Sequence, residues 1–410
     1  MHTGDWIACF GREPSLSAWE LYRVTGQDFG TLHKEVAVLP PMPGHSLVQL
    51  QQRCGGLVKV GEVLGIAPDL VSLHATLVQA WPQLVPAGST ARVHFGVSVY
   101  GAGGATLPQV RKEAKNLAQG LKRELVERGR SARLVIAKEP VLPAAALIQG
   151  KILERGFEIL ILTTPDGLVW GKTVAVQDIS GYGNRDVGRP RRDATSGMLP
   201  PKLAQIMVNL TAPRPQATLL DPFCGSGTIL QEAALLGVEH IVGSDMSDKA
   251  VQDSTVNIAW LQEHSQVTKD IRVFRADAAE IAKHVKPNSI ETIATEPYLG
   301  PPQRGVPRGR VLLPLISALS RQYEQWLQAM ADVLQPGGRL AMVWPFFQVE
   351  KQGYFLQVQD AAKNAGFQVI QPPTWMLEQP WFRSTPRGTV LYSRPDQVVG
   401  REIALLEKHA

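Results

Sequence analysis

An aspartate, a cysteine and two glycines stand close together in DPFCGSGTIL, residues 221–230, directly after the short apolar run 218–220. The glycines, Gly225 and Gly227, permit a tight turn and let the backbone approach a ligand closely. The helical pattern that begins at Thr228 offers free backbone N–H groups in its first turn. These residue types and spacings predict a ligand held against the backbone between a strand and a helix.

The carboxylate of Asp221 at the mouth of this loop separates two classes of ligand. A dinucleotide site normally has G-x-G-x-x-G and neutral surroundings, because a carboxylate repels a pyrophosphate. The same carboxylate attracts a cation, and S-adenosyl-L-methionine carries both an ammonium and a sulfonium. Asp245 ends the next strand and can accept from ribose hydroxyls, while Asp277 ends the third and can accept from the adenine amine. A lone strand-end acid is usually a helix cap, but three behind a glycine loop favour this cofactor.

The loop and the strand ends together supply the expected cofactor contacts. They are Asp221, Pro222, Phe223, Cys224, Gly225, Gly227, Thr228, Asp245, Met246, Asp277 and Ala278. We interpret Cys224 as small packing, because nothing nearby in the sequence would activate a thiolate. The three cysteines of the chain are spaced for neither a disulfide framework nor a zinc site, so we expect no metal.

Strands and helices alternate from residue 202 onward, which predicts a doubly wound, Rossmann-like α/β domain with a parallel sheet over residues 202–398. The expected strands are 217–221, 239–244, 271–276, 290–295, 339–344, 367–371 and 389–392. The expected helices are 202–210, 228–236, 248–260, 315–334 and 351–365. In such a sheet, ligands bind at the carboxyl ends of the strands.

The chain of 410 residues is too long for one ordinary core, so we expect further domains before this one. Residues 1–89 read as a small α+β unit, and residues 90–177 as a second unit with a long amphipathic helix at 108–128 and another helix at 142–156. Residues 178–201 have almost no aliphatic content and four arginines, which predicts a basic linker.

Positive charge is concentrated in the middle of the chain. Residues 90–205 hold 18 Lys and Arg against 10 Asp and Glu, a net charge of +8, although the whole chain carries only +5. This block indicates a polyanion partner, with a solvated basic face as an equally weighted alternative. The candidate phosphate contacts are Arg111, Lys112, Lys115, Arg185, Arg189, Arg191, Arg192 and Arg304.

DPFCGSGTIL resembles the first motif of adenosylmethionine-dependent methyltransferases that act on exocyclic amines of nucleic-acid bases. GRPRRDATSGMLPPKLAQIMVNL, residues 188–210, together with the basic block, resembles the THUMP-domain tRNA guanosine methyltransferases. This resemblance covers nearly the whole chain. It implies a ferredoxin-like unit at 1–89, a THUMP RNA-binding domain at 90–177, the linker, and a catalytic domain that methylates the exocyclic amine of a guanosine at tRNA position ten.

The resemblance also implies a D/N-P-P-Y/F/W motif after the fourth strand, where this chain has Thr295, Glu296, Pro297 and Tyr298. An aromatic exocyclic amine is a poor nucleophile, and acceptors for its two hydrogens localise its lone pair toward the methyl group. Either Glu296 or Thr295 takes the place of the motif's acid. We favour Glu296 as the acceptor, with Tyr298 stacking on the base. The opposing interpretation is a salt-bridged carboxylate and a core aromatic.

Two other functions stay open at this stage. A DNA amino-methyltransferase would share the fourth-strand chemistry, and an RNA-binding protein could keep the fold after losing catalysis, as the altered TEPY suggests. The sequence shows no secretory signal and no apolar run long enough for a bilayer, so we expect a cytoplasmic protein without membrane contact. Whether one or two methyl groups are added, and whether a partner subunit is needed, is not determined by the sequence.

Overall fold

The computed structural model describes residues 1–85, 91–104, 106–192, 198–265, 267–301, 309–350, 352–394 and 397–409. The chain divides into two compact units, the first formed by residues 1–18 and 25–179 and the second by residues 19–24 and 180–410. Within the described ranges, no helix is long and apolar enough to cross a bilayer.

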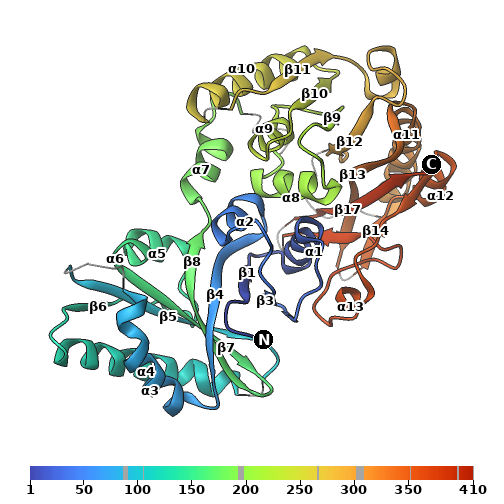
Figure 1. The fold of residues 1–410 in the computed structure, drawn as a ribbon. Helices are drawn as coiled ribbons and strands as arrows, with labels where there is room; N and C mark the ends of the chain where they lie inside the picture. The colour runs from blue at the N-terminus through green and yellow to red at the C-terminus, as the bar shows by residue number, and fades with distance from the viewer. Residues whose placement is uncertain are drawn as a thin grey trace. The chain divides into compact units, whose positions relative to one another are not determined.

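One mixed sheet organises the first unit (Figure 1). Its described strands follow the order β2-β3-β1-β4-β8-β7-β5-β6. They are β1 (Trp6–Phe10), β2 (Thr31–His33), β3 (Val36–Leu39), β4 (Leu57–Ala67), β5 (Val93–Gly101), β6 (Ala132–Leu134), β7 (Gly156–Thr164) and β8 (Gly167–Val176). Strands from the ranges 1–89 and 90–177 therefore hydrogen-bond within a single sheet, through the antiparallel pair β4–β8. The ferredoxin-like and THUMP assignments stay predictions, and the expected boundary at 89/90 lies outside the described residues.

The helices of the first unit are α1 (Pro14–Thr25), of which residues 19–24 count with the second unit, α2 (Leu47–Arg53), α3 (Leu70–Leu84), α4 (Leu107–Glu127), α5 (Ala144–Gln149) and α6 (Ile152–Arg155). Helix α4 packs Val110, Leu117 and Leu121 into the core of this unit. The single helix expected at 142–156 is wrong. It breaks into α5 and α6 because Gly150 weakens it and Lys151 adopts a left-handed backbone with φ of +50°.

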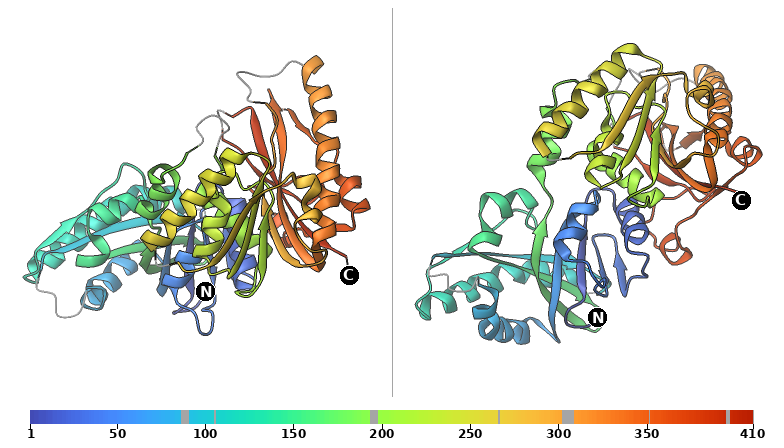
Figure 2. Two further views of the ribbon diagram at one scale, coloured as in Figure 1. Left: turned by 90° about the horizontal axis from the view of Figure 1, so that it is seen from above. Right: turned by 45° about the horizontal axis from the view of Figure 1, so that its top comes forward.

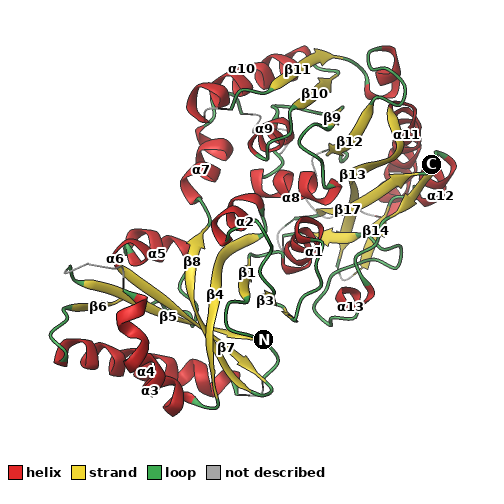
Figure 3. Ribbon diagram, viewed as in Figure 1, coloured by secondary structure: helices red, strands yellow, loops and turns green. Residues whose placement is uncertain are grey.

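The second unit is built on the doubly wound sheet that the sequence predicts (Figure 3). Its described strands are β9 (Thr218–Asp221), β10 (His240–Asp245), β11 (Asp270–Arg275), β12 (Ile290–Thr295), β13 (Leu334–Val349), β14 (Gln352–Phe355), β15 (Phe367–Val369), β16 (Val390–Tyr392) and β17 (Val399–Lys408). The order along the sheet is β11-β10-β9-β12-β13-β17-β15. Strands β9 to β13 are parallel, and β17 runs antiparallel to β13.

Helices cover both faces of this sheet, and Figure 2 shows α10 and α11 on opposite sides of it. The helical segments are α7 (Ile179–Gly183), the π-helix η1 (Asn184–Gly188), α8 (Pro201–Thr211), α9 (Thr228–Leu235), α10 (Asp248–Ser265), the 3₁₀-helix η2 (Ala278–Lys283), α11 (Gly309–Val333), α12 (Gln359–Asn364) and α13 (Thr374–Leu377). Leu220, Ile293, Tyr323, Leu327 and Met342 belong to the buried core between the central strands and α11.

Two expectations for this unit are wrong. The helix expected at 351–365 is the strand β14 followed by the short helix α12. Residues 352–355 extend because Tyr354 and Phe355 pair with the end of β13, where Phe355 stacks on Phe346 at 5.4 Å between ring centroids. Strand β17 was not expected, and it continues the sheet beyond residue 398.

Candidate active site

The carboxyl end of β9 is the topological switch point of the second unit. Strand β9 pairs in parallel with β10 on one side and β12 on the other, so the chain leaves it toward β10 and returns later on the opposite side. The ends of these strands diverge there, and ligands of open α/β sheets bind in the resulting crevice. Asp221, Asp245 and Thr295 are the last residues of the three strands, so this part of the sheet brings them together.

The glycine loop has the backbone conformation that its sequence predicts. Gly225 and Gly227 have φ of +50° and +83°, values that side chains disfavour. A Cβ on Gly227 would lie 2.5 Å from the Ser254 hydroxyl, whereas a Cβ on Gly225 would have nothing within 4 Å. The loop is thus closed against α10 at one glycine and open at the other. This open backbone face fits a ligand lying against the loop, as does the first turn of α9 behind it.

Asp221 is a buried carboxylate, 1% exposed, and no ion pair within the described ranges includes it. Its Oδ1 accepts hydrogen bonds from the Thr295 hydroxyl at 2.7 Å and the Phe223 N–H at 3.1 Å. Burial raises the pKa of Asp221 to about 7 against these two hydrogen bonds, and the carboxylates of Asp245 and Glu296 add to the rise. A site of this kind stabilises a ligand cation.

The other two strand-end acids are already engaged by the backbone. Asp245 accepts from the Gly225 N–H at 3.1 Å and from the Ser247 N–H at 2.9 Å, which ties β10 to the glycine loop. Asp277 is exposed and caps η2 through the Ala279 N–H at 2.9 Å. Each carboxylate keeps further lone pairs for a ligand, since an ionised carboxylate has about four acceptor positions. Their roles toward ribose and adenine stay predictions.

The remaining expected cofactor contacts divide by exposure. Met246, beside Asp245, is 70% exposed. Pro222, Cys224, Thr228 and Ala278 are buried, and Phe223 packs edge-on against Trp326 with 4.7 Å between ring centroids. Burial raises the pKa of the Cys224 thiol well above its usual value, and the neighbouring carboxylates of Asp221 and Asp245 raise it further. This agrees with a packing role for Cys224 rather than a nucleophilic one.

The polar residues at the end of β12 differ in their partners and in their exposure. The hydroxyl of Thr295 is buried and committed to Asp221. Glu296, with a side chain 12% exposed, forms a two-point ion pair with Arg401 of β17. Tyr298 is 51% exposed, and its backbone carbonyl accepts from the Tyr323 hydroxyl at 3.2 Å. Glu296 thus has the salt bridge of the opposing interpretation, whereas the exposed Tyr298 is not a core aromatic. Thr295 and Glu296 each have a partner within the site, so the choice between the two alignments with the D/N-P-P-Y motif stays a prediction.

Arg401 is the residue of this site that sequence reasoning missed. Its contact with Glu296 spans 105 positions and depends on β17, for which there was no prediction. The one signal in the sequence was the charged pair Arg401–Glu402 directly before the apolar run 403–406, because buried charges are normally paired.

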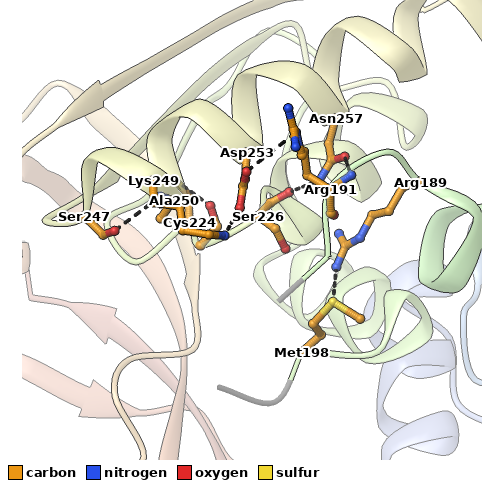
Figure 4. A network of polar contacts seen from close by, with 11 residues as sticks. Arg189, Arg191, Met198, Cys224, Ser226, Ser247, Lys249, Ala250, Asp253 and Asn257 are labelled. Atoms are coloured by element: carbon orange, nitrogen blue, oxygen red, sulfur yellow. Dashed lines mark hydrogen bonds and ion pairs between the residues drawn. The ribbon is translucent and has the colours of Figure 1, made fainter. Parts of the chain in front are cut away.

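Two of the linker arginines, Arg189 and Arg191, lie beside α9 and α10 (Figure 4). Arg189 is 3% exposed and donates to the Thr228 hydroxyl at 2.8 Å. Arg185 donates through Nε to the buried Glu232 at 2.6 Å. These positions are a correction to the expected phosphate contacts of Arg185 and Arg189, since their guanidinium groups serve internal partners.

The backbone of Arg191 is held by both amide atoms of Asn257 at 2.9 Å, and Asn257 also donates to the Ser226 carbonyl of the glycine loop at 2.9 Å. The side chains of Arg191 and Arg192 are exposed, so phosphate contact stays a prediction for these two. Arg304 lies outside the described residues.

The basic helix α4 keeps part of its expected surface. Lys112 and Lys115 are exposed, whereas Arg111 is partly buried and pairs with Glu35 at 2.8 Å. The two lysines therefore stay candidates for phosphate contact, and Arg111 has a competing partner within its own unit.

Residues 189–348 match a family model described as the RMKL-like methyltransferase domain, UPF0020. The tRNA (guanine(10)-N2)-dimethyltransferase of Pyrococcus abyssi is 33% identical over 172 residues, 42% of this chain and 44% of the relative. The tRNA (guanine(6)-N2)-methyltransferase of Thermus thermophilus is 32% identical over 152 residues, 37% of this chain and 40% of the relative. The chain thus matches less than half the length of these curated relatives.

The fold extends further than the sequence match. The crystal structure of TrmN from Thermus thermophilus superposes with a TM-score of 0.56 at 18% identity, covering 98% of this chain and 99% of that one. Both units therefore have counterparts in a solved structure. Residues 189–348, which hold the switch-point site, are thus similar to the RMKL-like methyltransferase domain, and the likeness to the solved structure extends the fold over both units.

Proposed function

We propose that the chain is an S-adenosyl-L-methionine-dependent methyltransferase that methylates the exocyclic amine of a guanosine in tRNA, at position ten. The observation that carries this proposal is the grouping of Asp221, Thr295 and Glu296 at the switch point, with the exposed Tyr298 two residues further on. The names of the relatives from Pyrococcus abyssi and Thermus thermophilus support tRNA as the substrate and guanine N2 as the target.

The cofactor supplies a methyl group on a positively charged sulfur. Asp221 would hold its ammonium, because a buried carboxylate without a cationic partner gains most from one. Asp245 would accept from the ribose hydroxyls and Asp277 from the adenine amine. The open face at Gly225 gives the loop room for a ligand against the backbone. This donor set fits a nucleoside that carries positive charge better than one that carries a diphosphate.

The residues after β12 act on the target amine. Glu296 accepts one of its hydrogens, which localises the nitrogen lone pair, and the ring of Tyr298 stacks on the base. The Tyr298 backbone is fixed by Tyr323, a fully buried residue of α11, so the ring projects from an anchored position. A guanine must leave its stack to reach such a site, and an exposed aromatic ring can compensate for part of the lost stacking.

The test is transfer of labelled methyl groups to unmodified tRNA, followed by digestion to nucleosides. We expect label in N2-methylated guanosine, and its loss when position ten of the transcript is replaced by adenosine. A matched transcript with position six replaced should be labelled normally. The ratio of one to two methyl groups is read from the same chromatogram.

The other functions predict different results in the same assay. Label in adenine of duplex DNA with none in tRNA would replace the proposal with a DNA amino-methyltransferase. Tight tRNA binding with no transfer, and no uptake of S-adenosylhomocysteine by calorimetry, would indicate an RNA-binding protein that has lost catalysis.

A further inference from the structure

Arg401 lies within β17, where the strand ladder fixes its backbone on both sides. It stands opposite Pro345 of β13 and opposite Tyr392 of β16. Consecutive side chains of a strand point to opposite faces. Arg401 accordingly reaches Glu296 at the end of β12, while its neighbour Glu402 pairs with Arg387. Of these two adjacent charges, only Arg401 is directed at the candidate active site.

Two nitrogens of the Arg401 guanidinium contact the two oxygens of the Glu296 carboxylate. Nε donates to Oε2, and an Nη donates to Oε1 at 3.1 Å. A fork of this kind fixes the plane of the carboxylate as well as its position. The guanidinium is 5.8 Å from the centroid of the Tyr392 ring, and both charged side chains are nearly buried, at 10% and 12% exposure. The pair therefore has little freedom to rearrange.

The pairing leaves Glu296 able to accept another hydrogen. An ionised carboxylate offers about four lone-pair positions, and the guanidinium occupies two of them. Arginine stays protonated at any working pH, so the positive partner of Glu296 is permanent. Glu296 also has one more rotatable bond than the aspartate or asparagine of the D/N-P-P-Y motif. The fork removes that added freedom.

We propose that Arg401 is a positioning residue for methyl transfer, which holds the Glu296 carboxylate in place to accept a hydrogen of the target amine. This inference rests on the proposed function. It assigns Arg401 no contact with the cofactor, so its loss should slow the chemical step without weakening cofactor binding.

The first test is a kinetic cycle of Arg401→Gln, Glu296→Ala and the double variant, assayed with unmodified tRNA. A displacement near 1 Å costs about 100-fold in rate, so we expect Arg401→Gln to lower kcat by about 100-fold with KM for tRNA unchanged. Arg401→Lys keeps the charge without the fork and should fall between Arg401→Gln and the wild type. The double variant should be no slower than Glu296→Ala. Multiplied losses in the double variant, or full activity of Arg401→Gln, would overturn the inference.

The control is Arg387→Gln, which breaks the ion pair of the next residue on the same strand. Glu402 is fully buried and the Arg387 side chain is 13% exposed, so this variant should lower thermal stability while kcat per folded molecule stays at the wild-type value. Affinity for S-adenosylhomocysteine, measured by calorimetry at pH 8.5, above the pKa of Asp221, should be the same in all variants. If Arg387→Gln lowers kcat as much as Arg401→Gln does, the effect is a general loss of folded structure and the inference is wrong.

A crystal structure of the full-length Arg401→Lys variant decides the inference independently of activity. We expect the Glu296 carboxylate to leave the position that it has in the wild type, and an unmoved carboxylate would overturn the positioning role. If the wild type transfers no methyl group to tRNA, the proposed function fails, whereas this structural comparison still gives its own answer.

Discussion

At the scale of single residues, the electrostatics of the site are set by carboxylates that differ in their partners. Glu296 has a permanent cation beside it, whereas Asp221 is held by a hydroxyl and a backbone N–H. Burial raises the pKa of Asp221 to about 7, so near neutral pH this group exchanges its proton readily. A bound ammonium would replace that proton.

The affinity for S-adenosylhomocysteine should therefore depend on pH through Asp221. A cation prefers the ionised carboxylate, so binding lowers the pKa of Asp221 and releases a proton wherever the free protein is protonated. The dissociation constant should fall by up to about tenfold per pH unit below pH 7 and level off above it. Calorimetry between pH 5.5 and 8.5 measures this. Asp221→Asn should bind more weakly with a flat profile, and a flat wild-type profile would contradict the assignment.

Arg185 is a second residue whose partner defines its role. Its side chain is 16% exposed, and Glu232 beneath it is 2% exposed. Burial raises the pKa of Glu232 even with this arginine beside it, so the carboxylate depends on the pair to stay charged. Removing one member of a buried ion pair leaves the other charge buried without a partner of opposite sign.

Arg185→Ala should lower the free energy of unfolding by about 3–5 kcal/mol, the usual cost of an uncompensated buried charge. Urea titration measures the change. Arg192→Ala, at an exposed position of the same segment, is the control and should shift stability by less than about 0.5 kcal/mol. Unchanged stability together with weakened tRNA binding in Arg185→Ala would restore the phosphate-contact interpretation.

At the scale of elements, the pairing of β13 with β17 delivers Arg401 to the site, and one glycine controls how closely these strands approach. A Cβ on Gly400 would lie 2.3 Å from the ring of Phe346, which is buried and stacked on Phe355. Because the Phe346 ring is packed on all sides, it cannot move aside at low energetic cost. Any residue larger than glycine at position 400 must therefore displace β17 beside Arg401.

Gly400→Ala should therefore cost about 1–3 kcal/mol of stability, as overpacking of a core does. It should also lower kcat, because it shifts the neighbour that orients Glu296. Thermal unfolding and tRNA methylation rates check both effects. Gly183→Ala is the matched control, since its φ of −59° and open surroundings accept a methyl group and predict a gain of about 0.4–1 kcal/mol. Equal behaviour of the two variants would show that this contact does not constrain the strand.

The elements also show where sequence patterns stop being informative. Strands β9 to β12 and their helices could be predicted, because short apolar runs alternate with helical periodicity and end in the acids of the site. Strand β17 could not, since REIALLEK suits a helix or a strand and only pairing with β13 decides between them. The Arg401–Glu296 ion pair could not be predicted from the sequence for the same reason. The tight turn of the glycine loop was predictable because it depends on residues adjacent in the sequence, Gly225 and Gly227.

At the scale of the whole molecule, the candidate phosphate contacts and the candidate catalytic residues belong to different units. The described lysines of α4 that stay exposed, Lys112 and Lys115, belong to the first unit, whereas Glu296 and Asp221 belong to the second. Phosphate contacts fix a nucleic acid in register without reading its sequence, and catalytic contacts act on one base. Substitutions in the two units should therefore separate tRNA binding from methyl transfer.

Replacing both Lys112 and Lys115 by glutamate should raise KM for tRNA and leave kcat unchanged, because the altered side chains lie in the first unit and the proposed active site lies in the second. The salt dependence of tRNA binding should become shallower, with the slope of log K against log salt reduced by roughly one for each phosphate left without its lysine. Filter binding from 50 to 300 mM salt, alongside initial rates, measures both. Lys286→Glu, an exposed charge reversal in the second unit, is the control for net charge. If it raises KM as much as the α4 variant does, tRNA responds to total charge and α4 is not a docking surface.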